Sequence, residues 1–186
     1  MSEVVKWTPD EVLRASGETA PFRYQPSFPA RFLVENGLIE GRVFDWGCGH
    51  GYDVEYFIKN GIEAVGWDPV HCPENPPEIY PQGFLNWIHC AFVLNTLPEA
   101  KQRIKILAQI HEMLPENGHV VLTLRSRQEL KREIKQTWSI VNDGYVTSKG
   151  TFQKGFSSSE AVELLEPLFA EITVIKANPV MVIARK

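Results

Sequence analysis

Hydrophobic positions along the chain follow two alternating periods. Short, continuous apolar runs, the kind that form buried strands, predict strands at residues 41–45, 63–68, 84–90, 119–124, 171–175 and 180–184. Apolar positions spaced three and four residues apart predict helices at residues 30–39, 53–59, 100–113, 128–138 and 157–169. In the helix at 100–113 we expect one buried side, formed by Ile104, Leu107, Ile110 and His111. Strands that alternate with helices and then close as a pair indicate an α/β fold, with a mostly parallel sheet and an antiparallel edge strand.

The first 28 residues are predicted to form a helix and a cover segment ahead of a main domain at residues 29–186. Thr8, Pro9 and Glu11 supply an N-cap hydroxyl, a proline at the first helical position and a glutamate that can complete a capping box. They predict a helix that ends near Ser16. Residues 17–29 are rich in proline and aromatic side chains, which favours an ordered segment over a flexible linker.

Composition narrows the class of protein. A length of 186 residues suits a single catalytic domain, and a net charge of −4 gives no sign of the basic surface that nucleic acid requires. A small-molecule partner is therefore expected, although charge alone does not decide against nucleic acid. Three cysteines cannot all pair and no signal-peptide pattern opens the chain, so we expect a cytoplasmic protein. The apolar runs are too short for a transmembrane helix, and the oligomeric state stays open.

A glycine-rich turn follows the first predicted strand. Gly47, Gly49 and Gly51 occupy alternate positions there, where a backbone needs positive φ or must let a ligand come close. Asp68 ends the next strand, at the interval where an acid can accept hydrogen bonds from ribose hydroxyls. The third glycine arrives one residue too early for a dinucleotide fingerprint, and Asp45 would repel a pyrophosphate but could help to hold an ammonium group. S-adenosylmethionine therefore fits better than a nicotinamide cofactor.

These residues resemble the motifs of class I S-adenosylmethionine-dependent methyltransferases, with a Rossmann-like sheet. FDWGCGHG is similar to their first motif and AVGWDP to their second; WIHCAFVLN with LP resembles the segment after the fourth strand, and LPENG the turn into the fifth. The similarity covers residues 31–186. It implies S-adenosylmethionine as cofactor and a set of cofactor-binding residues: Asp45, Gly47, Cys48, Gly49, Gly51, Asp68, Pro69, Cys90, Ala91 and Phe92.

Roles within that set follow from the resemblance. The glycine loop would pack against the methionine and ribose, and Asp68 would bind the ribose hydroxyls. The backbone at Cys90 and Ala91 would face the amino-acid part, with Phe92 near the methyl group. The chain departs from the family between Asp68 and the next strand, where only a short, proline-broken segment at 69–83 remains. We therefore expect the third strand to be reduced or missing, which leaves only Pro69, Val70 and His71 as candidate adenine contacts.

A narrower similarity concerns three other stretches. PSFPARFLVENGLI, the shortened gap after GWDP, and TSKGTFQKGFSSSE together resemble the predicted methyltransferases associated with DNA phosphorothioation gene clusters. Asn75-Pro76-Pro77-Glu78 partly resembles the motif with which amino-group DNA methyltransferases hold a base, but a glutamate stands in place of the aromatic residue and no strand precedes it. A proline-rich loop is the better interpretation of these four residues.

Candidate catalytic and substrate residues lie at strand ends, in the glycine loop and in one insertion. His89 and His50 are candidate general bases, although each can equally be a structural hydrogen-bonding residue. The segment at 139–156 lies where this fold commonly carries substrate-selective insertions. No C-x-x-C pair is present to seed a zinc site, so no metal is expected. The candidate substrate contacts are Tyr52, Asn95, Tyr145 and Gln153.

Three functions stay open at this point. The first is methyl transfer to a small molecule by direct displacement. The second is methyl transfer to nucleic acid or modified DNA with the help of a partner protein. The third is cofactor binding by a non-catalytic accessory protein that has kept the glycine loop.

Overall fold

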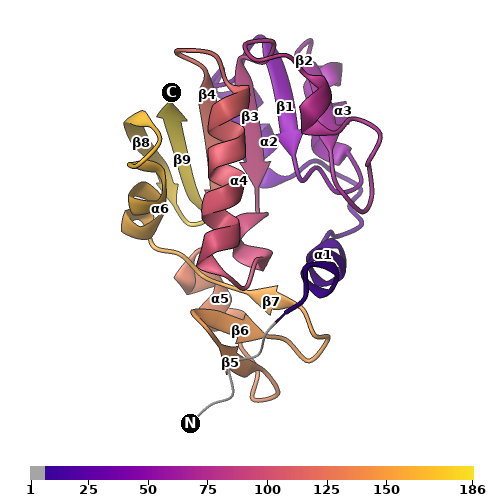
Figure 1. Cartoon of the computed structure of the whole chain (residues 1–186), viewed down its shortest axis with the longest axis vertical. Helices are drawn as coiled ribbons and strands as arrows, with labels where there is room; N and C mark the ends of the chain where they lie inside the picture. Colours follow the sequence, from indigo (N-terminus) through magenta and orange to yellow (C-terminus); the bar gives the residue numbers. More distant parts are fainter. Residues whose placement is uncertain (1–6) are drawn as a thin grey trace.

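The structure is a computed structural model that describes residues 7–186, and its centre is a six-stranded sheet (Figure 1). The strands are β1 (Arg42–Trp46), β2 (Glu63–Trp67), β3 (Trp87–Ala91), β4 (His119–Leu124), β8 (Ala170–Ala177) and β9 (Val180–Arg185), in the order β2-β1-β3-β4-β9-β8. Neighbours among the first four are parallel, whereas β9 runs antiparallel to β4 and β8 antiparallel to β9. The predicted fold class, including its antiparallel edge, is confirmed.

Helices cover both faces of the sheet because alternate strand residues are apolar on each side. On one face, α2 (Phe28–Glu35) and α3 (Tyr52–Lys59) place Leu33 and Phe57 against Val43 of β1. On the other, α4 (Ala100–Met113) and α6 (Ser158–Leu165) pack Leu107 and Leu165 into a cluster around Phe44. The sheet is therefore buried between two apolar layers.

The predicted loss of the third strand is also confirmed. Strand β2 forms the edge of the sheet, and between it and β3 the chain contains only the short 3-10 helix Pro77–Ile79. Tyr80 in this segment packs edge-on against Phe44, with ring centroids 5.4 Å apart. The shortened segment therefore covers part of the sheet without adding a strand.

Helix α1 (Pro9–Gly17) begins with the predicted capping box, in which Thr8 and Glu11 exchange hydrogen bonds. Val12 is buried in the same apolar cluster as Phe44. Figure 1 shows α1 at the end of the sheet toward which the arrows of β1 and β3 point. Helix α1 thus shares the main core, while the division of the chain at residue 28 stays a prediction, and residues 1–6 of that segment lie outside the described residues.

The segment at 139–156 forms a second, three-stranded antiparallel sheet from β5 (Ser139–Val141), β6 (Gly144–Val146) and β7 (Phe152–Gln153). It is tied to α4 by Arg103, which donates to the carbonyl of Leu97 at 2.7 Å and pairs with Asp143 at 2.5 Å. Arg103 is only 2% exposed, whereas Ile104 is 55% exposed. The prediction that Ile104 is buried was wrong, because α4 turns the arginine inward to meet this small sheet.

Three helix ends also differ from the sequence prediction, and the first is that of α2, which ends at Glu35, four residues before Ile39. Helix α5 (Arg127–Glu133) ends five residues before Trp138, and α6 ends four residues before Phe169. Both begin with a capping box, at Ser126 and Ser157 respectively. No helix within residues 7–186 is both long enough and apolar enough to cross a bilayer.

Candidate cofactor and acceptor site

A cavity of about 350 Å³ lies where β1, β2 and β3 end. Carboxyl ends of parallel strands meet at one edge of a sheet, and in open α/β sheets ligands bind at that edge. This volume is within the range of small-molecule sites. Gly51, Cys90 and His89 are not on its wall, but the wall includes most of the predicted cofactor residues: Asp45, Gly47, Cys48, Gly49, Pro69, Asp68, Ala91 and Phe92, together with His50 and Tyr52.

The glycine loop has the backbone geometry that the sequence predicted. Gly47, Gly49 and Gly51 have φ values of 72°, 55° and 80°, in the left-handed region that favours glycine. A Cβ atom on Gly47 would also lie closer than 3.0 Å to Val93 Cγ2. The amide of Gly47 donates to the carbonyl of Trp67 at 2.8 Å, which fixes the loop to β2. The loop can therefore make its tight turn beside Val93, and Gly47 and Gly49 line the cavity without side chains.

Asp68 closes the opposite side of the loop. Its Oδ2 accepts a hydrogen bond from the amide of Gly49 at 3.2 Å, and its Oδ1 accepts from the amides of Val70 and His71, both at 2.9 Å. An ionised carboxylate offers about four lone-pair positions, so these three bonds leave room for a hydroxyl donor. Asp68 is thus a fixed carboxylate on the cavity wall.

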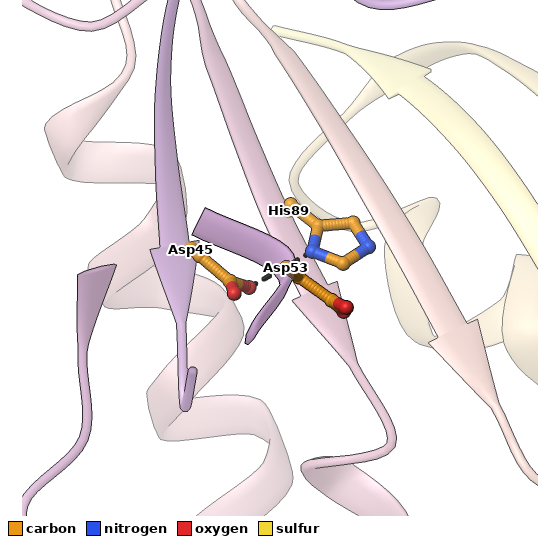
Figure 2. Close-up of side chains that lie close together, drawn as sticks. All are labelled: Asp45, Asp53 and His89. Carbon is orange, nitrogen blue, oxygen red and sulfur yellow. Dashed lines mark hydrogen bonds and ion pairs between the residues drawn. The ribbon is translucent and has the colours of Figure 1, made fainter. Parts of the chain in front are cut away.

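Behind the loop, three ionisable side chains form a buried group, shown in Figure 2. Asp45 Oδ1 lies 2.8 Å from Nδ1 of His89, and the two side chains are 4% and 0% exposed. Asp53, from the first turn of α3, accepts from the amide and the hydroxyl of Ser27, both at 2.6 Å. The cover segment is thereby fastened to the helix that follows the glycine loop.

The electrostatics of this group favour keeping a proton. Burial raises the pKa of the Asp45 carboxyl, against the opposing charge and hydrogen bond of His89. Burial alone would lower the pKa of His89, but the charge and hydrogen bond of Asp45 outweigh it, so the pKa of His89 is raised. Because His89 is fully buried and absent from the cavity wall, its geometry is that of a residue that positions Asp45.

Asp45, Asp53 and His89 are also close enough to hold a metal ion, with ligand atoms within 4.8 Å of one another. Each of them already has a partner: His89 Nδ1 bonds to Asp45, and both oxygens of Asp53 accept from Ser27. These hydrogen bonds engage atoms that a metal would need, whereas Nε2 of His89 is buried without a partner among the described residues. Sequence reasoning missed Asp53, since its partner Ser27 lies 26 residues away.

A second hollow, of about 300 Å³, adjoins the first. Asn95 and Gln153, two of the predicted substrate contacts, lie on its wall, whereas Tyr145 is on the wall of neither hollow. Phe92 stands between them with a φ of 61°, which is uncommon for a bulky residue and is found mostly at functional positions. Five residues line both hollows: Thr19, Pro21, Arg23, Phe92 and Thr96.

The wall of the second hollow is polar. Arg125 donates to Oε1 of Gln153 at 3.1 Å and pairs with Glu133. Asn95 is 3% exposed, and its side-chain oxygen accepts from the amide of Arg125 at 3.4 Å. Arg23 makes no ion pair with any residue of the described part of the chain, and nothing in the sequence pattern singled it out. The second hollow therefore offers several hydrogen-bond donors.

The fold is a doubly wound sheet, and at its strand ends a cavity is lined by a glycine loop and an acidic residue, as in α/β proteins that bind nucleosides. A family profile described as "Methyltransferase domain" matches residues 12–163. The chain belongs to the methyltransferase domain family, which confirms the resemblance found in the sequence. Among curated proteins, no sequence matches the chain.

Solved structures share the fold. The 1,6-didemethyltoxoflavin-N1-methyltransferase of Burkholderia thailandensis is 19% identical, with a TM-score of 0.62 over 86% of this chain and 77% of that one. An amino pentose methyltransferase from Micromonospora echinaspora is 12% identical, with a TM-score of 0.59 over 100% and 99% of the two chains. A S-adenosylmethionine-dependent methyltransferase from Methanosarcina mazei is 16% identical, with a TM-score of 0.59 over 87% and 98%.

Proposed function

We propose that the protein transfers a methyl group from S-adenosylmethionine to a small polar acceptor by direct displacement. The observation that carries this proposal is the pair of adjoining hollows that meet at Phe92, one with the glycine loop and Asp68, the other lined by polar side chains. Two of the solved structures that share the fold are described with S-adenosylmethionine or S-adenosylhomocysteine bound, which supports the same cofactor here.

The first hollow fits the chemistry of this cofactor. Gly47 and Gly49 line it without side chains, and Asp68 offers a fixed acceptor for ribose hydroxyls. Asp45 is buried at the base of the loop, where it can accept from the ammonium group of a methionine. When bound, S-adenosylmethionine supplies an electrophilic sulfonium methyl group. The protein then has to exclude water and hold a nucleophile in line.

The second hollow suits an acceptor with oxygen or ring-nitrogen atoms. Arg23 and the carboxamides of Asn95 and Gln153 offer donors that would fix such a molecule against Phe92. Proximity and orientation can supply most of the acceleration of a displacement reaction. A general base is needed only if the acceptor must lose a proton, and His50, which is on the wall of the first hollow, is the histidine better placed for that task.

The cofactor part of the proposal is tested by calorimetry. The wild type is titrated with S-adenosylhomocysteine beside Asp68→Ala and a matched control, Glu63→Ala. Glu63 is an exposed carboxylate at the other end of β2, so its loss removes an acid from the same strand without touching the cavity. We expect binding by the wild type and the control and a weakening of about tenfold or more in Asp68→Ala, because hydrogen bonds to a charged group contribute about 1.5–3 kcal/mol. No binding by the wild type, or undiminished binding by Asp68→Ala, would refute it.

The acceptor part needs a separate experiment. The protein and S-adenosylmethionine are incubated with a low-molecular-mass cell filtrate in one reaction and with purified nucleic acid in another. Formation of S-adenosylhomocysteine is followed, and mass spectrometry identifies the methylated product. Turnover confined to the filtrate supports a small-molecule acceptor, whereas turnover confined to nucleic acid contradicts it. Asp68→Ala serves as the control for turnover that does not depend on the cofactor site.

A further inference from the structure

The first hollow extends beyond the strand ends into a region enclosed by two helices. Helix α4 contributes Gln102, Ile106 and Gln109, which are spaced four and three residues apart and therefore lie on one side of the helix. Helix α1 contributes Pro9, Val12, Leu13 and Ser16 to the same wall. Trp46 of β1 and Trp67 of the edge strand β2 line the same cavity.

Contacts with two other segments of the chain fix helix α1 beside the cavity. Ser16 Oγ and Thr96 Oγ1 are 2.7 Å apart, which joins the helix to the segment after β3. The carbonyl of Gly17 lies 3.0 Å from Nε2 of His71, and a Cβ atom on Gly17 would come within 2.8 Å of Val70 Cγ2. The helix therefore touches the chain on both sides of the cavity, and its Gly17 permits the close contact with Val70.

The position of this region relative to Asp68 indicates which part of a nucleoside would occupy it. Val70 follows Asp68 by two residues and lines the same cavity. If Asp68 holds the ribose, the base attached to that ribose extends toward Val70 and the two helices. Leu13, Val70 and Ile106 offer apolar surface to the faces of a flat ring.

Gln109 is the side chain suited to the polar edge of that ring. Gln102 uses its oxygen to accept from the amide of Glu99 at 3.2 Å, as part of the cap of α4. Gln109 forms no hydrogen bond with any residue in the described range 7–186, so both its donor and its acceptor are free. A carboxamide can pair twice with adenine, accepting from the exocyclic amine and donating to the neighbouring ring nitrogen.

We propose that the adenine of the cofactor lies between α1 and α4, and that Gln109 recognises its polar edge. The inference rests on the proposed function, because it assigns a subsite to the cofactor named there. It makes Gln109 a residue that determines base specificity, and it gives α1 the task of covering the base where the sheet lacks a further strand.

Calorimetry with two ligands tests the role of Gln109. S-adenosylhomocysteine is compared with S-inosylhomocysteine, in which an oxygen replaces the exocyclic amine of the base. We expect the wild type to prefer the adenine compound by about tenfold, and Gln109→Leu to lose both that preference and about tenfold in affinity for it. Gln128→Leu, the same substitution at an exposed position on α5, should behave as the wild type.

A second pair of variants tests the wall formed by α1. Leu13 lines the cavity but is 41% exposed, so Leu13→Asp should fold normally while it places a charge against the base. We expect it to weaken binding of S-adenosylhomocysteine by about tenfold. Arg14→Asp, the neighbouring and exposed position on the same helix, should leave binding unchanged. Thermal denaturation of all variants checks that the fold is retained.

The outcomes separate this inference from the proposed function. Binding of S-adenosylhomocysteine by the wild type, with the adenine preference unchanged in Gln109→Leu, overturns the inference and leaves the proposed function standing. Equal weakening by Leu13→Asp and Arg14→Asp overturns the assignment of α1 in the same way. No binding of S-adenosylhomocysteine by the wild type overturns both.

Discussion

Replacing Gly47 by alanine tests whether the glycine loop is built for close approach. At a φ of 72°, a residue with a Cβ atom costs about 1–2 kcal/mol relative to glycine. The added Cβ would also lie closer than 3.0 Å to Val93 Cγ2, and overpacking of this kind costs about 1–3 kcal/mol. We therefore expect Gly47→Ala to lower the free energy of unfolding by about 2–5 kcal/mol.

A matched control isolates the two contributions. Gly61 has a φ of 80°, and a Cβ atom there would meet nothing within 4 Å, so Gly61→Ala has the backbone cost alone, about 1–2 kcal/mol. Urea denaturation measures both variants, and calorimetry with S-adenosylhomocysteine measures their binding. Gly61→Ala should bind as the wild type does, whereas Gly47→Ala should bind more weakly at a temperature where it is folded. Equal stability and equal affinity in the two variants would refute the reasoning, since Val93 would then be moving aside without cost.

Three further variants test the surroundings of the site. Arg103→Met should lower the free energy of unfolding by about 2 kcal/mol in urea denaturation, because the buried carbonyl of Leu97 loses its donor and Asp143 keeps only Lys154 as an ion-pair partner; a loss below about 1 kcal/mol would speak against this role. Asp45 and His89 both have raised pKa values, so the folded protein binds more protons than the unfolded one and its stability falls as pH rises through the raised pKa of His89. The free energy of unfolding of the wild type should therefore exceed that of His89→Gln by its full amount below about pH 6.5, and the difference should shrink above that pH. Urea denaturation at several pH values measures this difference, and a difference that grows with pH would contradict the prediction. Ser27→Ala removes the N-cap hydroxyl of α2 and a bond to Asp53, and it should cost about 1–2 kcal/mol in thermal denaturation, while an unchanged melting temperature would oppose it.

The sequence predicted those elements that depend on interactions between residues close together in the chain. Each strand of the main sheet is a short apolar run, and four of the helices carry Ser or Thr caps that the sequence displays. The side of α4 that is buried could not be predicted in the same way. The apolar pattern of α4 favoured burial of Ile104, but Arg103 is buried instead because it pairs with Asp143, forty residues further along the chain. A residue whose partner lies that far away leaves no periodic signal.

The same distinction applies to the site. Asp45, the glycine loop and Asp68 could be predicted from the sequence because each lies at the end of a strand. The carboxyl ends of parallel strands lie at one edge of the sheet, so these residues are close together in the fold. Gln109 has no such signal, since it lies in the third turn of α4 and not at the end of a strand, and only the tertiary structure places it on the cavity wall. Arg23 was missed for a related reason, as it belongs to a segment without regular structure.

The packing of α1 is related to the shortened link between β2 and β3, because that link adds no strand beyond β2. Because the sheet ends at β2, Trp67 has no further strand on its outer side, and its ring packs edge-on against Trp46 of β1. Val12 of α1 packs into the cluster that contains Trp46, and both Val12 and the neighbouring Leu13 line the cavity. One turn of helix therefore both closes the core and bounds the cavity. For this reason, changes that loosen α1 should lower stability and cofactor affinity together, whereas changes in the three-stranded sheet at 139–153 should separate the two.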